Sequence, residues 1–89
     1  MVFYDVVYTT IPHHPLFQLL AKNPDGTPIS DLIVKVVASA RGVTSKLFEG
    51  DVEIKGGTAR LNIGDVPFNA QNVDVRVSSS SLHIYLKYA

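Results

Sequence analysis

Residues 14–38, HPLFQLLAKNPDGTPISDLIVKVVA, decide the fold of this chain. Two apolar runs, Leu16–Ala21 and Leu32–Ala38, flank a short polar segment that contains two prolines. In that segment Pro24 presets the backbone for a turn, Asp25 can bond its own backbone, and Gly26 tolerates a positive φ. Apolar runs around such a signal are typical of β-strands. The stretch therefore predicts two antiparallel strands joined by a loop.

Apolar residues alternate with other residues along both runs, and again toward the C-terminus. Successive side chains of an extended chain point to opposite faces, so each alternating run predicts one buried face. The residues expected to face the core are Phe17, Leu19, Ala21, Leu32, Val34, Val36, Ala38, Ala59, Leu61, Ile63, Val73, Val75, Val77, Leu82, Ile84 and Leu86.

The first expected strand, residues 3–8, is apolar on both faces. Phe3 and Val7 fall on one face, while Val6 and two tyrosines fall on the other. A strand that is buried on one side only carries polar residues on its second face. We therefore expect a neighbouring domain or a linker to cover the second face.

Turn signals separate the remaining strands. Residues 41–42 and 49–50 predict turns, and Gly56-Gly57 predicts a two-residue hairpin turn, because both glycines tolerate a positive φ. Residues 11–15 carry two prolines and predict a crossing between sheets or a kinked edge. The other expected strands are residues 43–48, 52–54, 58–63, 73–77 and 82–87. We expect a loop at residues 64–68, with Phe68 as a possible plug under the sandwich, and a polar connector at residues 78–81.

These features predict an all-β domain. No helical period persists along the chain, and about seven or eight short strands recur at the turn spacing of a sandwich. The expected fold is a single antiparallel two-sheet β-sandwich of the fibronectin-III or immunoglobulin-like kind that spans residues 1–89.

Length, charge and cysteine content narrow the function classes. The 89 residues fit one domain, and eight basic side chains balance eight acidic ones. This balance disfavours a nucleic-acid surface, which needs a basic excess. The chain has no cysteine, so it has no disulfide, no thiolate nucleophile and no cysteine-ligated zinc. No apolar run has the length of a membrane span, and the first residues do not have the pattern of a signal peptide.

Candidate metal and catalytic sites are weak. His13 and His14 would point to opposite sides of an extended chain, which disfavours joint chelation with His83. The acid pairs Asp25 with Asp31 and Asp65 with Asp74 are too scattered to supply the oxygens that calcium needs. Ser78 to Ser81 lie near His83, but no nucleophile elbow or oxyanion nest accompanies them. We expect no catalytic residue, no metal and no cofactor, and therefore no enzyme.

Four tyrosines cluster near the two ends of the chain. They are Tyr4, Tyr8, Tyr85 and Tyr88. Two interpretations remain open: an aromatic platform for a sugar or peptide, or side chains that flank a junction with another domain. These four residues are the candidate interface.

The order of motifs resembles the macroglobulin-type domain of the α2-macroglobulin, complement and thioester-containing protein superfamily. The resemblance rests on an Asp-Gly-x-Pro turn followed by a Val-rich strand, a Gly-x-Ala-x-Leu-x-Ile strand, a Val-x-Val strand and a Tyr-Leu ending. The corresponding segments are residues 23–28, 33–37, 56–63, 73–77 and 78–89. The family's thioester motif needs a cysteine, so no thioester or catalytic residue carries over to this chain.

The resemblance implies a non-catalytic scaffold module of a large secreted protein of innate immunity or protease inhibition. Its partners would be neighbouring domains of the same parent chain, and Met1 would then be the first residue of an excised domain. The alternative is a free-standing extracellular module that binds carbohydrate or protein through its tyrosines. An apolar patch at one face or end would favour the scaffold, and an aromatic groove would favour the binding module.

Overall fold

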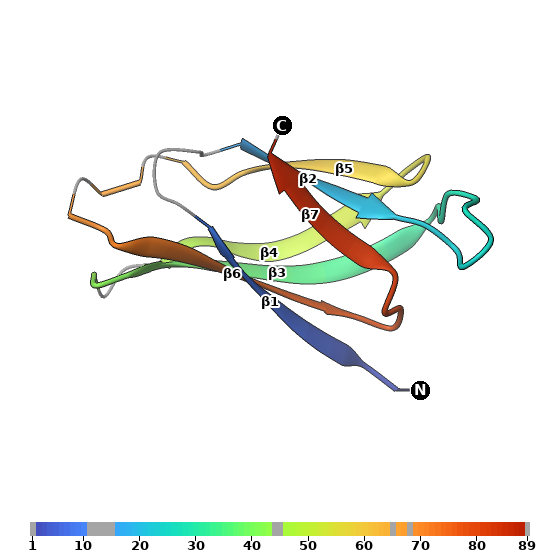
Figure 1. Ribbon diagram of the computed structural model, residues 1–89, viewed down its shortest axis with the longest axis horizontal. Coiled ribbons are helices and arrows are strands. Elements are labelled where there is room, and N and C mark those ends of the chain that lie inside the picture. The colour runs from blue at the N-terminus through green and yellow to red at the C-terminus, as the bar shows by residue number, and fades with distance from the viewer. Residues whose placement is uncertain (1, 11–15, 44–45, 65, 68, 89) are drawn as a thin grey trace.

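The computed structural model describes residues 2–10, 16–43, 46–64, 66–67 and 69–88, which form two packed antiparallel sheets (Figure 1). The larger sheet has the strand order β1-β6-β3-β4, and the smaller sheet has the order β5-β2-β7. The strands are β1 (Tyr4–Thr10), β2 (Leu16–Ala21), β3 (Leu32–Arg41), β4 (Lys46–Ile54), β5 (Thr58–Asn62), β6 (Asn72–Ser79) and β7 (Ile84–Tyr88). The predicted seven-stranded β-sandwich is confirmed.

The core lies between the two sheets and is built by the alternating residues that the sequence indicates. Leu19, Val36 and Val75 are fully buried, and each comes from the middle of its strand. Leu32 and Leu86 are partly buried and pack against the same core. Leu82 is an exception: it precedes β7 and is 54% exposed, so its predicted inward orientation is wrong.

The loop between β2 and β3 crosses from one sheet to the other, so these two strands do not pair with each other. The turn itself has the predicted chemistry. Gly26 has a φ of 93°, and its amide donates to the Asn23 carbonyl at 2.9 Å. The Asp25 carboxylate accepts from the Thr27 amide at 3.0 Å and from the Thr27 hydroxyl at 2.7 Å, which lowers the pKa of Asp25. The turn residues therefore determine the local bend, but they do not determine which sheet the next strand joins.

The Gly56-Gly57 turn also joins two sheets, because β4 belongs to the larger sheet and β5 to the smaller one. Both glycines have positive φ, 61° and 80°. Lys55 and Thr58 exchange backbone hydrogen bonds at 3.1 and 3.2 Å across the turn. The predicted two-residue turn is confirmed, but the predicted hairpin is wrong, because beyond the Lys55–Thr58 bridge the two strands enter different sheets and the turn forms a corner of the sandwich.

Strand β4 is longer than expected. The predicted turn at residues 49–50 is wrong, because Glu49 and Gly50 lie inside β4 and pair with Val37 and Val36 of β3. The expected strands 43–48 and 52–54 are therefore one edge strand, with a register shift opposite Ala38 and Ser39. Pairing with the long strand β3 outweighs the local preference of glycine for a turn.

Strand β6 extends into the predicted polar connector. It ends at Ser79, which is 2% exposed, so the expected connector at residues 78–81 begins two residues too early. The predicted turn at residues 41–42 is confirmed by Gly42, whose φ is 88°. The expected proline crossing at residues 11–15 and the expected plug Phe68 lie outside the described residues. Within the described part, no helix is long and apolar enough to cross a membrane.

Candidate functional site

One side-chain hydrogen bond ties the two terminal strands together across the sandwich. The Tyr8 hydroxyl of β1 donates to the backbone carbonyl of Ile84 at the start of β7. These residues belong to different sheets and are 76 positions apart in the sequence. Burial and, to a smaller extent, the neighbouring phenol of Tyr85 raise the pKa of Tyr8 above its ordinary value of 10.0. Tyr8 therefore contributes to the structure, with its polar tip already occupied.

The four candidate tyrosines lie on the two strands at this side of the sandwich. Tyr4 and Tyr8 share the inward face of β1 and are both partly buried. Tyr85 lies on the outer face of β7 and is 52% exposed. Tyr88 pairs through its backbone with Phe17 of β2, and its side chain is outside the described part. The proximity of Tyr8 to Tyr85 was not evident from the sequence, because it depends on how the two sheets stack.

Removal of the Tyr8 hydroxyl has a definite expected cost. We expect Tyr8→Phe to lower the free energy of unfolding by about 1 kcal/mol, because the Ile84 carbonyl loses a partly buried donor while the ring keeps its packing. Urea denaturation at neutral pH measures this difference. An unchanged denaturation midpoint would show that water replaces the hydroxyl without loss.

The same variant gives a pH test. A raised pKa in the folded state means that folding favours the protonated phenol, so its stabilisation is complete below the unfolded-state pKa near 10.0. That stabilisation is lost as pH rises through the higher folded-state pKa. We expect alkaline pH to destabilise the unsubstituted domain more than Tyr8→Phe, because only the unsubstituted domain carries the Tyr8 phenol.

Apolar side chains gather at one end of the sandwich. Val2, Phe3 and Ile33 are 66%, 68% and 65% exposed, and Leu82 is also exposed there. Tyr4 pairs with Ser79 and Lys35 with Ser78, so Phe3 and Ile33 flank the chain just beyond the end of β6. Val2 precedes Phe3, and Leu82 lies in the loop that follows β6. We call Val2, Phe3, Ile33 and Leu82 the apolar end; Figure 1 shows that the β2–β3 loop and the β4–β5 turn lie at this end too.

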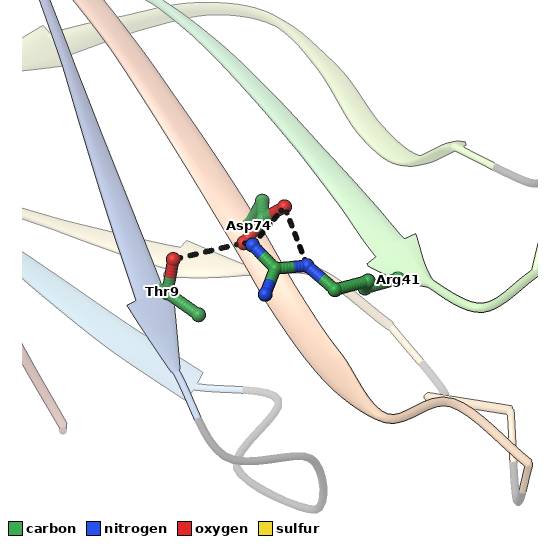
Figure 2. A network of polar contacts seen from close by, with 3 residues as sticks. All are labelled: Thr9, Arg41 and Asp74. Atoms are coloured by element: carbon green, nitrogen blue, oxygen red, sulfur yellow. Dashed lines mark hydrogen bonds and ion pairs between the residues drawn. The ribbon is translucent and has the colours of Figure 1, made fainter.

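The outer face of the larger sheet carries a charged network toward the opposite end, where β1 and β3 end and β6 begins. Figure 2 shows that Asp74 of β6 receives the Arg41 guanidinium from β3 and the Thr9 hydroxyl from β1. The Arg41 Nη2 atom lies 2.9 and 3.0 Å from the two carboxylate oxygens, and the Thr9 hydroxyl lies 3.0 Å from Oδ1. An open hollow of about 220 Å³ lies beside the network, lined by Val7, Val37, Ser39, Asp74 and Arg76. The network joins three strands across the sheet, a role that no local sequence pattern indicates.

The serine segment also has a structural role. The Ser79 hydroxyl accepts from the Ser81 amide at 3.0 Å, and the Ser81 hydroxyl accepts from the His83 amide at 3.2 Å. Both hydroxyls therefore shape the turn between β6 and β7. Asp74, the fourth candidate acid, is held by Arg41.

Among the described residues, no group of three or more His, Asp or Glu side chains is placed to hold a metal ion. The candidates His13, His14 and Asp65 lie outside the described ranges. Comparisons with protein-family models, with curated proteins and with solved structures found no match. The macroglobulin resemblance therefore rests on the sequence motifs alone.

Proposed function

We propose that this chain is a non-catalytic scaffold and interaction module of a larger secreted protein of the macroglobulin and thioester type. Its work is contact with neighbouring domains of the same parent chain. The observation that carries the proposal is the apolar end, where four large apolar side chains lie exposed together. Large contiguous apolar patches are rare on the surfaces of monomeric proteins, and where they occur they mark sites of contact with other proteins.

The chemistry of the apolar end fits a protein surface better than a sugar. Its three most exposed members are aliphatic or phenylalanine side chains without a polar tip. Sugar sites combine aromatic faces with convergent polar groups. On the neighbouring strands, the Tyr8 hydroxyl is already bonded to Ile84. Among the tyrosine side chains that the structure describes, Tyr85 is the exposed one available to the alternative, a free-standing carbohydrate- or protein-binding module.

Lysines at the two ends of the sandwich provide a test. Lys22 and Lys55 lie at the apolar end, where the Lys22 amide donates to the His83 carbonyl next to Leu82. Lys46 and Lys87 lie at the opposite end, at the start of β4 and near the end of β7. The natural protein that contains this sequence is treated with an amine-reactive cross-linker, and the linked peptides are identified by mass spectrometry.

We expect Lys22 and Lys55 to cross-link to other domains of the parent chain more often than Lys46 and Lys87 do. Links that favour the opposite end would reject the apolar end as the contact site. A natural protein that consists of this domain alone would reject the scaffold function. Binding of oligosaccharides that is lost in Tyr85→Ala would then support the alternative.

A further inference from the structure

The four edge strands of the sandwich differ in how they are protected against added strands. An edge strand exposes unpaired backbone groups, and proteins block such edges with charges, short strands, bulges or covering elements. Strand β4 carries Lys46, Glu49, Asp51 and Glu53, and its pairing with β3 has a register shift. Strands β5 and β7 are five residues each, and Tyr8 occupies the Ile84 carbonyl of β7.

Strand β1 shows none of these protections among the residues that the structure describes. It is seven residues long, contains no proline or lysine, and has one charged residue, Asp5. The register of its pairing with β6 is continuous over all seven residues. Its composition of valine, tyrosine and threonine favours an extended strand.

The polar side chains on the outer face of β1 turn toward β6, away from the free edge. The Asp5 carboxylate accepts from the Ser78 hydroxyl, and the Thr9 hydroxyl donates to Asp74. Both partners belong to β6, which lies on the paired side of β1 (Figure 2 shows the second contact). Val7, which stands between these two residues, is 53% exposed. The free edge therefore presents backbone and a valine, with its one carboxylate held back.

We propose that β1 pairs antiparallel with β1 of a second copy of this chain, which joins the two larger sheets into one. The full-length register turns about Val7, the central residue of the strand. Val7 then faces its own counterpart on the outer face, and Asp5 faces Thr9 of the second copy. No like charges of β1 meet in this register, and the cross-strand row of Val7, Arg76 and Val37 continues across the dyad.

Strand β4, at the opposite edge of the larger sheet, is less suited to self-pairing than β1. Self-pairing of β4 over its full length turns about Gly50 and sets Glu49 opposite Asp51 of the second copy. Like charges directly opposite each other destabilise a strand pair. The charge pattern therefore permits self-addition at β1 and opposes it at β4. This association goes beyond the scaffold function and does not depend on it.

The mass of the 89-residue chain in solution tests the proposal directly. Sedimentation equilibrium should show a concentration-dependent rise from 9.7 kDa toward twice that mass. We expect Val7→Lys to remain monomeric, because a lysine on the edge blocks strand addition. Ile33→Lys is the matched control: Ile33 is also solvent-exposed on the same sheet, 65% against 53% for Val7, but belongs to the inner strand β3, so dimerisation should persist. The proposal would be overturned if the unsubstituted 89-residue chain stayed monomeric up to millimolar concentration, or if both variants lost dimerisation equally.

The chain contains no cysteine, so single-cysteine variants report the register. Directly opposed residues in an antiparallel pair have Cα atoms about 4.5–5.5 Å apart, within reach of a disulfide. Under mild oxidation Val7→Cys should form a covalent dimer. Thr9→Cys should not, because the two copies of Thr9 lie four positions out of register, about 13 Å apart. Efficient cross-linking of Thr9→Cys but not of Val7→Cys would reject the register about Val7.

Discussion

A chain with Val75→Asp is expected to be unfolded at 25 °C. Val75 is fully buried on β6, the strand that pairs with both β1 and β3, where it lies opposite Tyr8 and Ala38. Loss of a buried valine costs about 1.5–3 kcal/mol, and an unpaired buried carboxylate adds several more. Because small domains have about 5–15 kcal/mol of stability, the sum approaches or exceeds the total.

Val2→Asp is the matched control for this substitution. It introduces the same side chain in place of the same residue type, but Val2 is 66% exposed. Far-ultraviolet circular dichroism and urea denaturation should show a parent-like Val2→Asp and an unfolded Val75→Asp. A cooperative transition of Val75→Asp at the parent midpoint would mean that β6 has the opposite inward and outward faces.

We expect Gly57→Ala to lower the free energy of unfolding by about 3 kcal/mol. Gly57 has a φ of 80°, where a β-carbon costs about 1–2 kcal/mol. That carbon would also lie 2.6 Å from Pro28 Cβ and 3.2 Å from the Ala21 carbonyl oxygen. The contact is rigid, because the Ala21 amide donates to the Gly57 carbonyl and the Ile29 amide donates to Ala21. Forced overpacking of this kind costs about 1–3 kcal/mol.

A substitution at the adjacent Gly56 separates the cost of the positive φ from the cost of the contact with Pro28. Its φ is 61°, and an added β-carbon would meet no atom within 4 Å. Gly56→Ala should therefore cost about 1 kcal/mol, and Gly56→Asn should be nearly neutral, because asparagine tolerates this conformation in a hairpin turn. Equal midpoints for the two alanine variants would show that the contact of Gly57 with Pro28 relaxes freely.

The sequence predicted the buried faces well because strand alternation is a local property. Phe17 and Val75 occupy the expected side of their strands for this reason. The pairing partners of each strand were harder to predict from the sequence, since they depend on contacts between distant segments. The loop at residues 22–31 illustrates the limit: its turn chemistry was evident, but its passage from one sheet to the other was not. The error at Gly50 has the same origin, because the long partner β3 keeps this glycine within β4.

The candidate interface was predicted only as a set of residues. The tyrosines near both ends of the chain suggested either an aromatic platform or a domain junction, and neither interpretation placed Tyr8 beside Tyr85 as the structure does. The hydrogen bond from Tyr8 joins a side chain to a backbone carbonyl, and a carbonyl leaves no signature in the sequence. The sequence did not reveal the apolar end either, because Phe3, just before β1, and Ile33 of β3 are far apart in the sequence and meet only through the pairing of these strands with β6.

The directions of the terminal strands have a mechanical consequence. Tyr4 pairs with Ser79 and β7 begins soon afterwards at Ile84, so β1 and β7 start at the same end and run the same way (Figure 1). Tension between the start of β1 and the end of β7 pulls these strands lengthwise in opposite directions. The β1–β6 and β2–β7 ladders are then sheared, so their hydrogen bonds carry the load together rather than opening one after another. With Tyr8 bonded directly to β7, the domain is arranged to bear force along its strands.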